Sequence, residues 1–208
     1  MKTFGRVLTA MITSFNEDGS VNIENSVAIA EHLLNHGSDG LVVCGTTGEN
    51  PTISRESKIA LFKAIAETCG DKGTIIANVG SNDTKGSVDF VKEVSTIPGI
   101  DGLLVVVPYY NKPNQQGQYL HFKSIAEATT LPIMVYNVPG RVGTGIFPAT
   151  LARLHKEYPH ICAIKEASGN LMIASEIKRL MPGEDFMVYS GDDGLRFPIL
   201  SVGGTGFI

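Results

Sequence analysis

Short apolar runs alternate with longer amphipathic segments along this chain of 208 residues. The alternation repeats at intervals of about 25 to 35 residues, which is typical of βα units that build a parallel sheet. Seven segments of helical periodicity lie between eight runs that we interpret as strands. The predicted strands are Val7–Ile12, Gly40–Cys44, Thr74–Val79, Gly102–Val107, Ile133–Tyr136, Ile161–Lys165, Phe186–Ser190 and Gly206–Ile208.

The sequence also marks the ends of the first two predicted helices. Asn22 is the expected N-cap of the first helix, and Gly37 is its expected terminator. The second helix is predicted from about Ser54 to Cys69 and ends at Gly70. Apolar residues at helical spacing indicate which side of each helix is buried. The first helix carries Ile23, Val27, Ala30 and Leu34 on one face, and the second is expected to bury Ile59, Phe62, Ile65 and Ala66.

Eight strands with intervening helices predict an α/β fold, a (β/α)₈ TIM barrel in which residues 1–208 form a single domain. The alternative is an open Rossmann-like sheet, but no strand leads into a G-x-G-x-x-G turn. The sequence ends within the eighth predicted strand, whereas a typical barrel of this kind has about 250 residues. We therefore expect a barrel that is truncated in or just after its eighth strand and lacks the C-terminal helices.

Charge and composition exclude several classes of protein. The formal net charge is -4 and Lys and Arg are scattered, so the chain has no basic stripe for nucleic acid or an anionic membrane surface. No apolar run approaches the roughly 18 residues of a membrane span, and the first residues lack the apolar segment of a secretory signal. We expect a cytoplasmic protein.

The cysteines and histidines indicate neither a disulfide framework nor a metal site. Cys44, Cys69 and Cys162 are widely spaced among apolar neighbours, which favours reduced core thiols. Cys44 precedes a Gly-Thr-Thr loop, but no histidine lies in a recognisable partner motif for a nucleophilic thiol. The five histidines have no HExxH-type spacing, so we expect no metal.

Lys165 is the most informative residue because it ends a short apolar run that is expected to be buried on both faces. A buried ammonium group must be paired or must lose its proton. A neutral lysine amine is a nucleophile for a carbonyl carbon. The other interpretation is a side chain that extends from the strand end to solvent, or that pairs with Glu166.

Polar groups follow three other predicted strands. Gly45–Glu49 is a glycine-flanked turn with two threonine hydroxyls that could hold a carboxylate, although such a turn is often only a tight connection. Tyr109 and Tyr110 follow the fourth strand, and paired tyrosines are usually packing residues. After the fifth strand, Tyr136 offers a phenol for proton transfer and Arg141 a guanidinium for a carboxylate. An amine, phenols, hydroxyls and an arginine together describe a site for a 2-oxo acid that forms a Schiff base, with no metal or organic cofactor.

The ordered set of these motifs resembles the dihydrodipicolinate synthase (4-hydroxy-tetrahydrodipicolinate synthase, DapA) family, from near residue 3 to residue 208. The resemblance implies a lyase that condenses pyruvate with L-aspartate-4-semialdehyde in lysine and diaminopimelate biosynthesis. It also implies a homo-oligomer, a tetramer built as a dimer of dimers. The motifs are Gly45-Thr46-Thr47-Gly48-Glu49, Pro108-Tyr109-Tyr110-Asn111, Tyr136-Asn137-Val138-Pro139-Gly140-Arg141-Val142-Gly143, Ile164-Lys165-Glu166-Ala167-Ser168-Gly169 and Ser190-Gly191-Asp192-Asp193.

The resemblance implies four catalytic residues. Lys165 matches the Schiff-base lysine, and Tyr136 matches the tyrosine that relays protons. Thr47 matches the middle of the hydrogen-bonded relay. Tyr110 matches the relay tyrosine that reaches in from a neighbouring subunit, so a lone chain would have an incomplete site.

The resemblance also implies the substrate contacts. Thr46 and Thr47, with the backbone around them, match the site for the carboxylate of pyruvate. Arg141 matches the arginine that binds the carboxylate of the semialdehyde. Gly191 and Ile208 match main-chain positions at the pyruvate end of the site.

One departure from the family concerns feedback inhibition by lysine, which uses a cleft between subunits. The positions that match its ligands are Asn50 and Pro51, Arg55, Lys58, and Gly86 in place of the acidic ligand. A lost charge-assisted contact costs roughly 1.5 to 3 kcal/mol. We expect weak or absent inhibition by lysine.

Two alternatives stay open at this point. Related class I pyruvate aldolases, such as N-acetylneuraminate lyase or a 2-keto-3-deoxy-sugar-acid aldolase, share the lysine and the tyrosine but generally lack an arginine at the position of Arg141. The chain could also be a truncated, non-catalytic form that keeps the pocket as a binding module.

Overall fold

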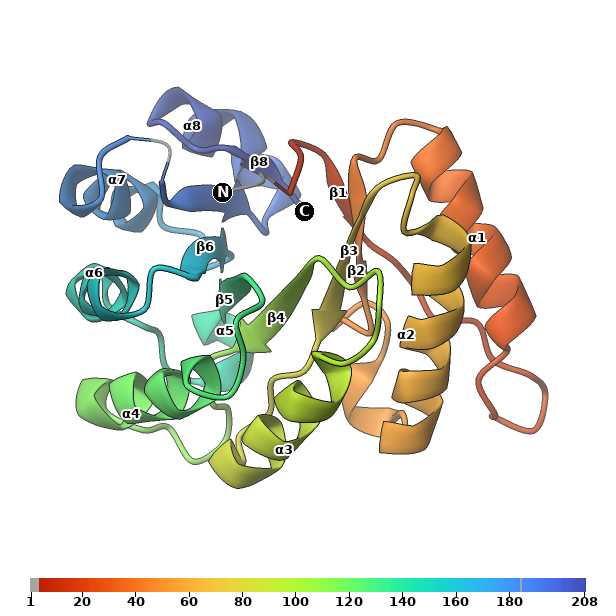
Figure 1. Ribbon diagram of the computed structural model, residues 1–208. Helices are drawn as coiled ribbons and strands as arrows, with labels where there is room; N and C mark the ends of the chain where they lie inside the picture. The colour runs from red at the N-terminus through yellow and green to blue at the C-terminus, as the bar shows by residue number, and fades with distance from the viewer. Residues whose placement is uncertain (1–3, 184) are drawn as a thin grey trace.

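Eight parallel strands form one sheet whose spatial order follows the sequence from β1 to β8. The computed structural model describes residues 4–183 and 185–208. Figure 1 shows the strands at the centre and the helices around them. The strands are β1 (Leu8–Ala10), β2 (Gly40–Val43), β3 (Thr74–Asn78), β4 (Gly102–Val106), β5 (Ile133–Asn137), β6 (Ile161–Glu166), β7 (Met187–Ser190) and β8 (Gly206–Phe207).

The sheet closes on itself between β8 and β1. Val7 and Phe207 form a parallel bridge, and the amide of Phe207 donates a hydrogen bond of 2.9 Å to the carbonyl oxygen of Arg6. On the opposite side of β8, the parallel pairing of Tyr189 with Gly206 joins it to β7. The predicted (β/α)₈ barrel is therefore confirmed, and the open Rossmann-like alternative is wrong.

Within the described residues, seven α-helices connect successive strands, as predicted, and one further α-helical turn was not predicted. The connecting helices are α1 (Ile23–Asn35), α2 (Arg55–Cys69), α3 (Thr84–Val94), α4 (Gln115–Ala126), α6 (Pro148–Glu157), α7 (Leu171–Leu180) and α8 (Arg196–Ser201). The additional element is α5 (Pro139–Val142), which also lies between β5 and β6. A single turn carries too few residues to show helical periodicity. None of the helices within the described residues has both the length and the apolar character that a membrane crossing requires.

The predicted helix ends are correct. The Asn22 side chain accepts a hydrogen bond from the Asn25 amide at the start of α1, and Gly37 adopts a φ of +105° just after its end. Such a φ strongly favours glycine. Ser54 caps α2 in the same way by accepting from the Ser57 amide. Of the four positions predicted to be buried in α2, Phe62, Ile65 and Ala66 are buried, whereas Ile59 is only half-buried.

Several strands differ from the prediction at their carboxyl ends. β1 ends at Ala10, and Ile12 is 54% exposed beyond it. β5 and β6 each continue one residue further, to Asn137 and Glu166. The Asn137 side-chain amide donates to the Glu166 carboxylate at 2.7 Å, so a polar pair extends this part of the sheet.

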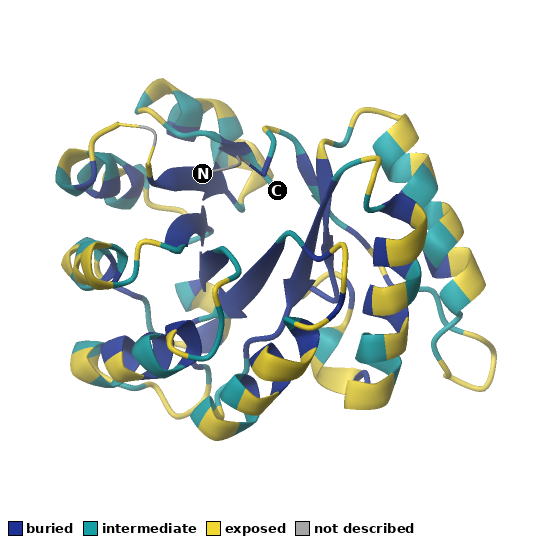
Figure 2. Ribbon diagram, in the orientation of Figure 1, coloured by how far each residue is buried: buried dark blue, intermediate teal, exposed yellow. Residues whose placement is uncertain are grey.

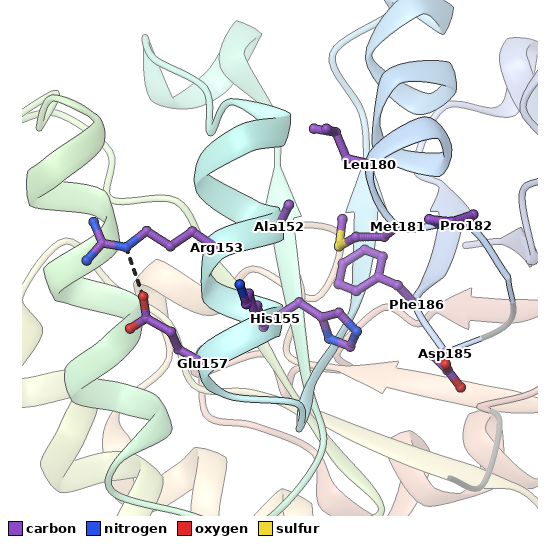
Figure 3. Close-up of a pocket in the computed structure, with 10 residues that line it drawn as sticks. Ala152, Arg153, His155, Glu157, Leu180, Met181, Pro182, Asp185 and Phe186 are labelled. Atoms are coloured by element: carbon purple, nitrogen blue, oxygen red, sulfur yellow. Dashed lines mark hydrogen bonds and ion pairs between the residues drawn. The ribbon is translucent and has the colours of Figure 1, made fainter.

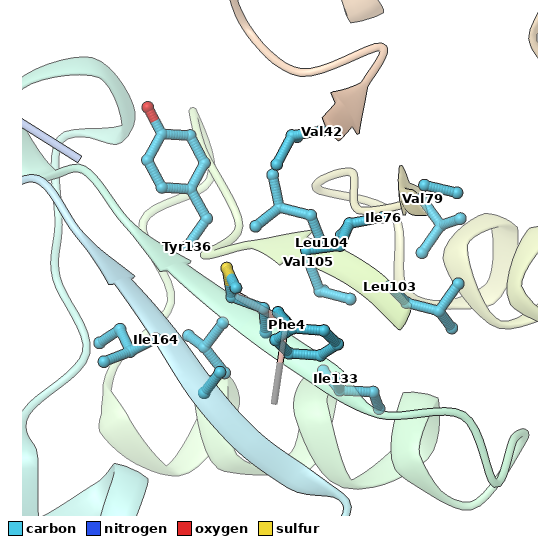
Figure 4. Close-up of a cluster of buried hydrophobic side chains, with 14 of the residues drawn as sticks. Phe4, Val42, Ile76, Val79, Leu103, Leu104, Val105, Ile133, Tyr136 and Ile164 are labelled. Atoms are coloured by element: carbon cyan, nitrogen blue, oxygen red, sulfur yellow. The ribbon is translucent and has the colours of Figure 1, made fainter. Parts of the chain in front are cut away.

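Aliphatic side chains fill the barrel and the layer between the barrel and its helices. Figure 2 shows buried strands inside a shell of helices whose outer faces are exposed. Phe4 packs at Gly102, where an added Cβ would lie 2.6 Å from its ring. In Figure 4 the phenol of Tyr136 points away from the aliphatic cluster around Leu104. The polar site described below therefore lies at the other end of the packed core, where the strands end.

Candidate active site

A cavity of about 880 Å³ lies at the carboxyl ends of the strands. In (β/α)₈ enzymes this end of the barrel carries the chemistry. Seven of the eight site residues predicted from the sequence line this cavity. They are Thr46, Thr47, Tyr136, Arg141, Lys165, Gly191 and Ile208.

Lys165 carries its amine into the barrel from β6. The residue is 7% exposed, between Tyr136 on β5 and Tyr189 on β7 in the strand register. Burial lowers the pKa of Lys165 to about 8. The nearby Asp193 carboxylate raises this pKa, and the Arg141 guanidinium lowers it further. Close to half of the amine is then neutral near pH 8, so the group is available as a nucleophile.

Glu166 does not pair with Lys165, and Lys165 does not extend to solvent. The Glu166 carboxylate accepts hydrogen bonds from the Asn137 side-chain amide and the Ser168 backbone amide, each at 2.7 Å. Burial raises the pKa of Glu166. Successive residues of a strand point to opposite faces, which separates the two side chains. The structural interpretation of Lys165 as a surface or ion-paired lysine is therefore wrong.

Tyr136 is the nearest aromatic neighbour of the Lys165 amine. The Lys165 Nζ lies 4.8 Å from the centroid of the Tyr136 ring. Tyr136 is 6% exposed and pairs in register with Lys165 across the β5–β6 ladder. The phenol and the amine thus line the same cavity from adjacent strands.

A strained turn presents the two threonines after β2. Cys44 and Glu49 have φ values of 53° and 59°, in the left-handed region. The Thr13 hydroxyl donates to the Gly48 carbonyl at 2.8 Å, and the Glu49 amide donates to the Thr46 carbonyl at 3.1 Å. These bonds fix an exposed turn whose hydroxyls line the cavity.

Cys44 itself is not a nucleophile. It is fully buried, and burial raises its pKa to about 12. The reactive form of cysteine is the thiolate, which is negligible at neutral pH with such a pKa. Cys69 and Cys162 are also free and buried, as predicted.

Tyr110 is the one predicted site residue that does not line the central cavity. It is 88% exposed and has a φ of 70°. It lines a second cavity of about 380 Å³ together with Tyr109. Thr46, Tyr136 and Arg141 line both cavities, whereas Thr47 lines only the central one.

Sequence reasoning missed several residues that line these cavities, among them Asp193 and Asn78. Asp193 lines the central cavity and acts electrostatically on Lys165. It belongs to the Ser190-Gly191-Asp192-Asp193 motif, so its signal was present in the sequence. Asn78, at the end of β3, lines the second cavity. Its position at the carboxyl end of a barrel strand could have indicated it.

A further cavity, of about 640 Å³, lies on the outside of the barrel between α6 and α7 (Figure 3). The polar groups there serve the helices themselves. Arg153 donates to Glu157 on the same helix at 2.9 Å, and the His155 ring lies against Phe186. None of the sequence-predicted site residues lines this cavity, so the chemistry belongs to the barrel mouth.

The fold and the buried amine define a (β/α)₈ barrel of the class I aldolase type. The chain belongs to the Dihydrodipicolinate synthetase family, whose pattern matches residues 3–208.

Proteins named 4-hydroxy-tetrahydrodipicolinate synthase are similar to nearly the whole chain. The protein of Desulforamulus reducens is 51% identical over 205 residues, which cover 99% of this chain and 69% of the relative. The protein of a Cyanothece species is 50% identical over 209 residues, which cover 100% of this chain and 70% of the relative. The chain thus spans about 70% of the length of these relatives.

Solved structures give the same assignment. A dihydrodipicolinate synthase from Bacillus anthracis superposes with a TM-score of 0.96 at 42% identity, over 100% of this chain and 70% of that one. The enzyme of Cyanidioschyzon merolae, solved with lysine bound, superposes with a TM-score of 0.95 at 43% identity. The match covers 99% of this chain and 69% of that one.

Proposed function

We propose that this chain catalyses the Schiff-base condensation of pyruvate with L-aspartate-4-semialdehyde to 4-hydroxy-tetrahydrodipicolinate, on the route to lysine and diaminopimelate. The observation that carries the proposal is the Lys165 amine, which lies in the barrel cavity with a pKa of about 8. The family membership and the relatives that bear the synthase name support the choice of reaction.

The first half of the reaction uses the pyruvate end of the cavity. The neutral Lys165 amine attacks the ketone carbon, and water leaves as the imine forms. The carboxylate of pyruvate is held at the turn that carries Thr46 and Thr47. The Tyr136 ring lies 4.8 Å from the amine, which supports its phenol as the group that transfers protons during these steps.

The second half joins the two substrates. Loss of a methyl proton converts the imine to an enamine, whose carbon attacks the aldehyde. The amino group of the second substrate then displaces Lys165 from the former ketone carbon and closes the ring. Arg141 lines both cavities, which suits a guanidinium that holds the carboxylate of the second substrate. An arginine here also favours the synthase over aldolases that accept polyhydroxylated sugar acids.

The geometry favours Thr46 as the hydroxyl in the middle of the proton relay. The family resemblance assigns this role to Thr47. Thr46, however, lines the central cavity with Lys165 and also the second cavity with Tyr110. A relay between Tyr136 and Tyr110 needs a group that reaches both, and we propose Thr46 for it.

We further propose that a second copy of the chain completes the site. Tyr110 is 88% exposed, and a relay tyrosine supplied by a neighbouring subunit is expected to protrude in this way. We propose the cytoplasm as the location of the enzyme, where three free buried thiols stay reduced.

A coupled assay tests the function. Pyruvate and L-aspartate-4-semialdehyde are the substrates, and the downstream NADPH-dependent reductase reports product. We expect turnover from the chain and none from a Lys165→Ala variant. Borohydride reduction in the presence of pyruvate should attach one pyruvate to Lys165, as seen by peptide mass spectrometry. A folded chain that forms no adduct would instead be a binding module.

A further inference from the structure

A buried polar pair lies between the loop that carries Arg141 and the strand that carries Lys165. Asn137 ends β5 and is fully buried, and Glu166 ends β6 and is 2% exposed. The two residues pair in register across the ladder, and the Asn137 Nδ2 donates to the Glu166 Oε2 at 2.7 Å. Neither residue lines the central or the second cavity. The pair therefore has no direct contact with the substrates of the proposed reaction.

The Asn137 side chain closes the loop between β5 and α6. Its Oδ1 accepts a hydrogen bond of 3.2 Å from the Ile146 amide, nine residues further along the chain. A Cβ added at Gly145 would lie 3.1 Å from the same oxygen, so the loop passes close to it. The bond to the Glu166 carboxylate fixes Nδ2 as the donor and Oδ1 as the acceptor. The side chain therefore ties the two ends of the loop together.

The position of Arg141 depends on this loop. Arg141 lies in the single turn α5, near the middle of the segment that Asn137 closes. Among the described residues, its guanidinium has no hydrogen-bond or ion-pair partner. Gln115 holds the outer side of the loop by donating to the Gly145 carbonyl at 2.8 Å. The Asn137 bond leads instead through Glu166 to the strand of the reactive lysine.

Glu166 is held at its own end of the pair. Its Oε1 accepts from the Ser168 amide at 2.7 Å, and its carbonyl oxygen accepts from the Gly191 amide at 2.8 Å. Lys165 precedes it and points to the opposite face of the strand. A change in the Glu166 side chain can then move the Arg141 loop without moving the lysine amine.

We propose that Asn137 and Glu166 are positioning residues that set the distance between the Arg141 guanidinium and the Lys165 amine. The inference rests on the proposed function, in which Arg141 holds the carboxylate of the second substrate. A binding group displaced by about 1 Å can cost roughly 100-fold in rate. Formation of the pyruvate imine does not use Arg141, so the pair acts on the second substrate alone.

The test separates the two halves of the reaction. Borohydride trapping at saturating pyruvate reports on Lys165, and the coupled assay gives the KM for L-aspartate-4-semialdehyde. In Asn137→Ala we expect this KM to rise at least about tenfold, while the trapping rate stays within about twofold. Hydrogen exchange in residues 138–147 should accelerate, because the Ile146 amide loses its acceptor. An unchanged KM, or an equal loss of trapping and turnover, overturns the inference.

A reversed pair provides the rescue. In the double variant Asn137→Asp with Glu166→Gln, the amide at position 166 donates to the carboxylate at position 137. The amides of Ile146 and Ser168 keep their acceptors. We expect the KM of this variant to lie within about threefold of the unsubstituted chain, whereas Glu166→Gln alone should raise it about fivefold by the loss of one bond.

These two variants decide the matter even if Asn137→Ala fails to fold. A double variant that folds but keeps the high KM contradicts the proposal. A normal KM in Glu166→Gln contradicts it as well, because the pair would then not hold the loop.

Ser26→Ala is the matched control. The Ser26 hydroxyl is buried, accepts from the Ser14 amide at 3.0 Å and lines neither cavity, so it holds another loop by a similar bond. Its KM and trapping rate should equal those of the unsubstituted chain. A comparable rise in KM here would assign the effect to lost stability and overturn the inference. If the unsubstituted chain forms no adduct, or an adduct without turnover, the proposed function fails and the inference fails with it.

Discussion

Gly191 lies directly against the Lys165 side chain. A Cβ added at Gly191 would come within 2.9 Å of both Cγ and Cε of Lys165 and within 3.0 Å of the Ala167 Cβ. Cβ atoms do not approach other carbon atoms so closely. The absence of a side chain at position 191 therefore leaves the space in which Lys165 extends into the cavity.

A Gly191→Ala substitution should displace the Lys165 amine. Because a reacting group moved by about 1 Å can lose roughly 100-fold in rate, we expect borohydride trapping of pyruvate to slow by about 10- to 100-fold. The measurement is the rate of adduct formation, followed by mass spectrometry.

Gly140→Ala is the control for that substitution, since an added Cβ there meets nothing within 4 Å. Its trapping rate should equal that of the unsubstituted chain. Full-rate trapping by Gly191→Ala would show that Lys165 has another productive path into the cavity.

The order of the strands and most of the site could be predicted from the sequence, because both depend on local pattern. Apolar runs mark the barrel strands, and polar groups after them must meet at one end of a parallel barrel. The sequence therefore predicts that Thr46, Tyr136, Arg141 and Lys165 share one cavity, and in the structure they do.

Relations across the barrel could not be predicted in this way. Nothing in the local sequence shows that the Glu166 carboxylate accepts a hydrogen bond from the Asn137 side chain. Nor does it show that Asn78 lies beside the turn after β2. The exposure of Tyr110 likewise depends on tertiary structure. These features follow from strand register, which periodicity does not specify.

The rate of Schiff-base formation should depend on pH through Lys165. The neutral amine is the reactive form, and the pKa of Lys165 is about 8. Trapping with pyruvate should therefore accelerate as the pH rises from 6 to about 8 and then level off. An unperturbed lysine would continue to gain about tenfold per pH unit up to roughly pH 10. A profile that still climbs steeply above pH 9 would contradict the effect of burial.

The burial of Lys165 also lowers the free energy of unfolding of the chain. The folded-state pKa of about 8 lies below the ordinary 10.5, so the unfolded chain binds the proton more tightly. A shift of this size corresponds to about 3 kcal/mol of lost stability below pH 8, and the loss disappears as the pH rises through 10.5. Lys165→Met should abolish activity yet raise the free energy of unfolding at pH 7 by about 1 to 3 kcal/mol. Urea unfolding at pH 7 and at pH 10 measures the difference in the free energy of unfolding between Lys165→Met and the unsubstituted chain. This difference should be smaller at pH 10.

His121 should make the fold sensitive to acid. It is 3% exposed, its Nδ1 lies 2.8 Å from the Thr84 hydroxyl, and burial lowers its pKa to about 4 while Asp83 opposes the shift. Between pH 6.5 and 4 the unfolded chain takes up a proton that the folded chain does not. Stability is therefore complete above pH 6.5 and falls by up to about 3 kcal/mol as the pH drops to 4.

A His121→Gln variant should lose this part of the acid dependence in urea titrations at pH 6.5, 5.5 and 4.5. Identical slopes for His121→Gln and the unsubstituted chain would assign the acid sensitivity to other groups.

The cleft that matches the lysine site of the family is cationic in this chain. A cavity of about 240 Å³ brings together Asn50, Pro51, Arg55, Lys58 and Gly86. Within the described part of the chain, no residue that lines this cavity carries a carboxylate. Glu93, which does not line the cavity, already accepts from Arg55 at 2.8 Å, and the Asp83 carboxylate lies behind Gly86.

An incoming lysine ammonium would therefore meet two cations instead of a carboxylate. We expect millimolar L-lysine to leave the turnover rate within about twofold, since the lost charge-assisted contact is worth roughly 1.5 to 3 kcal/mol and repulsion adds to it. Calorimetric titration with L-lysine should likewise show no binding in the micromolar range. Micromolar inhibition would mean that a carboxylate outside this cavity supplies the missing contact.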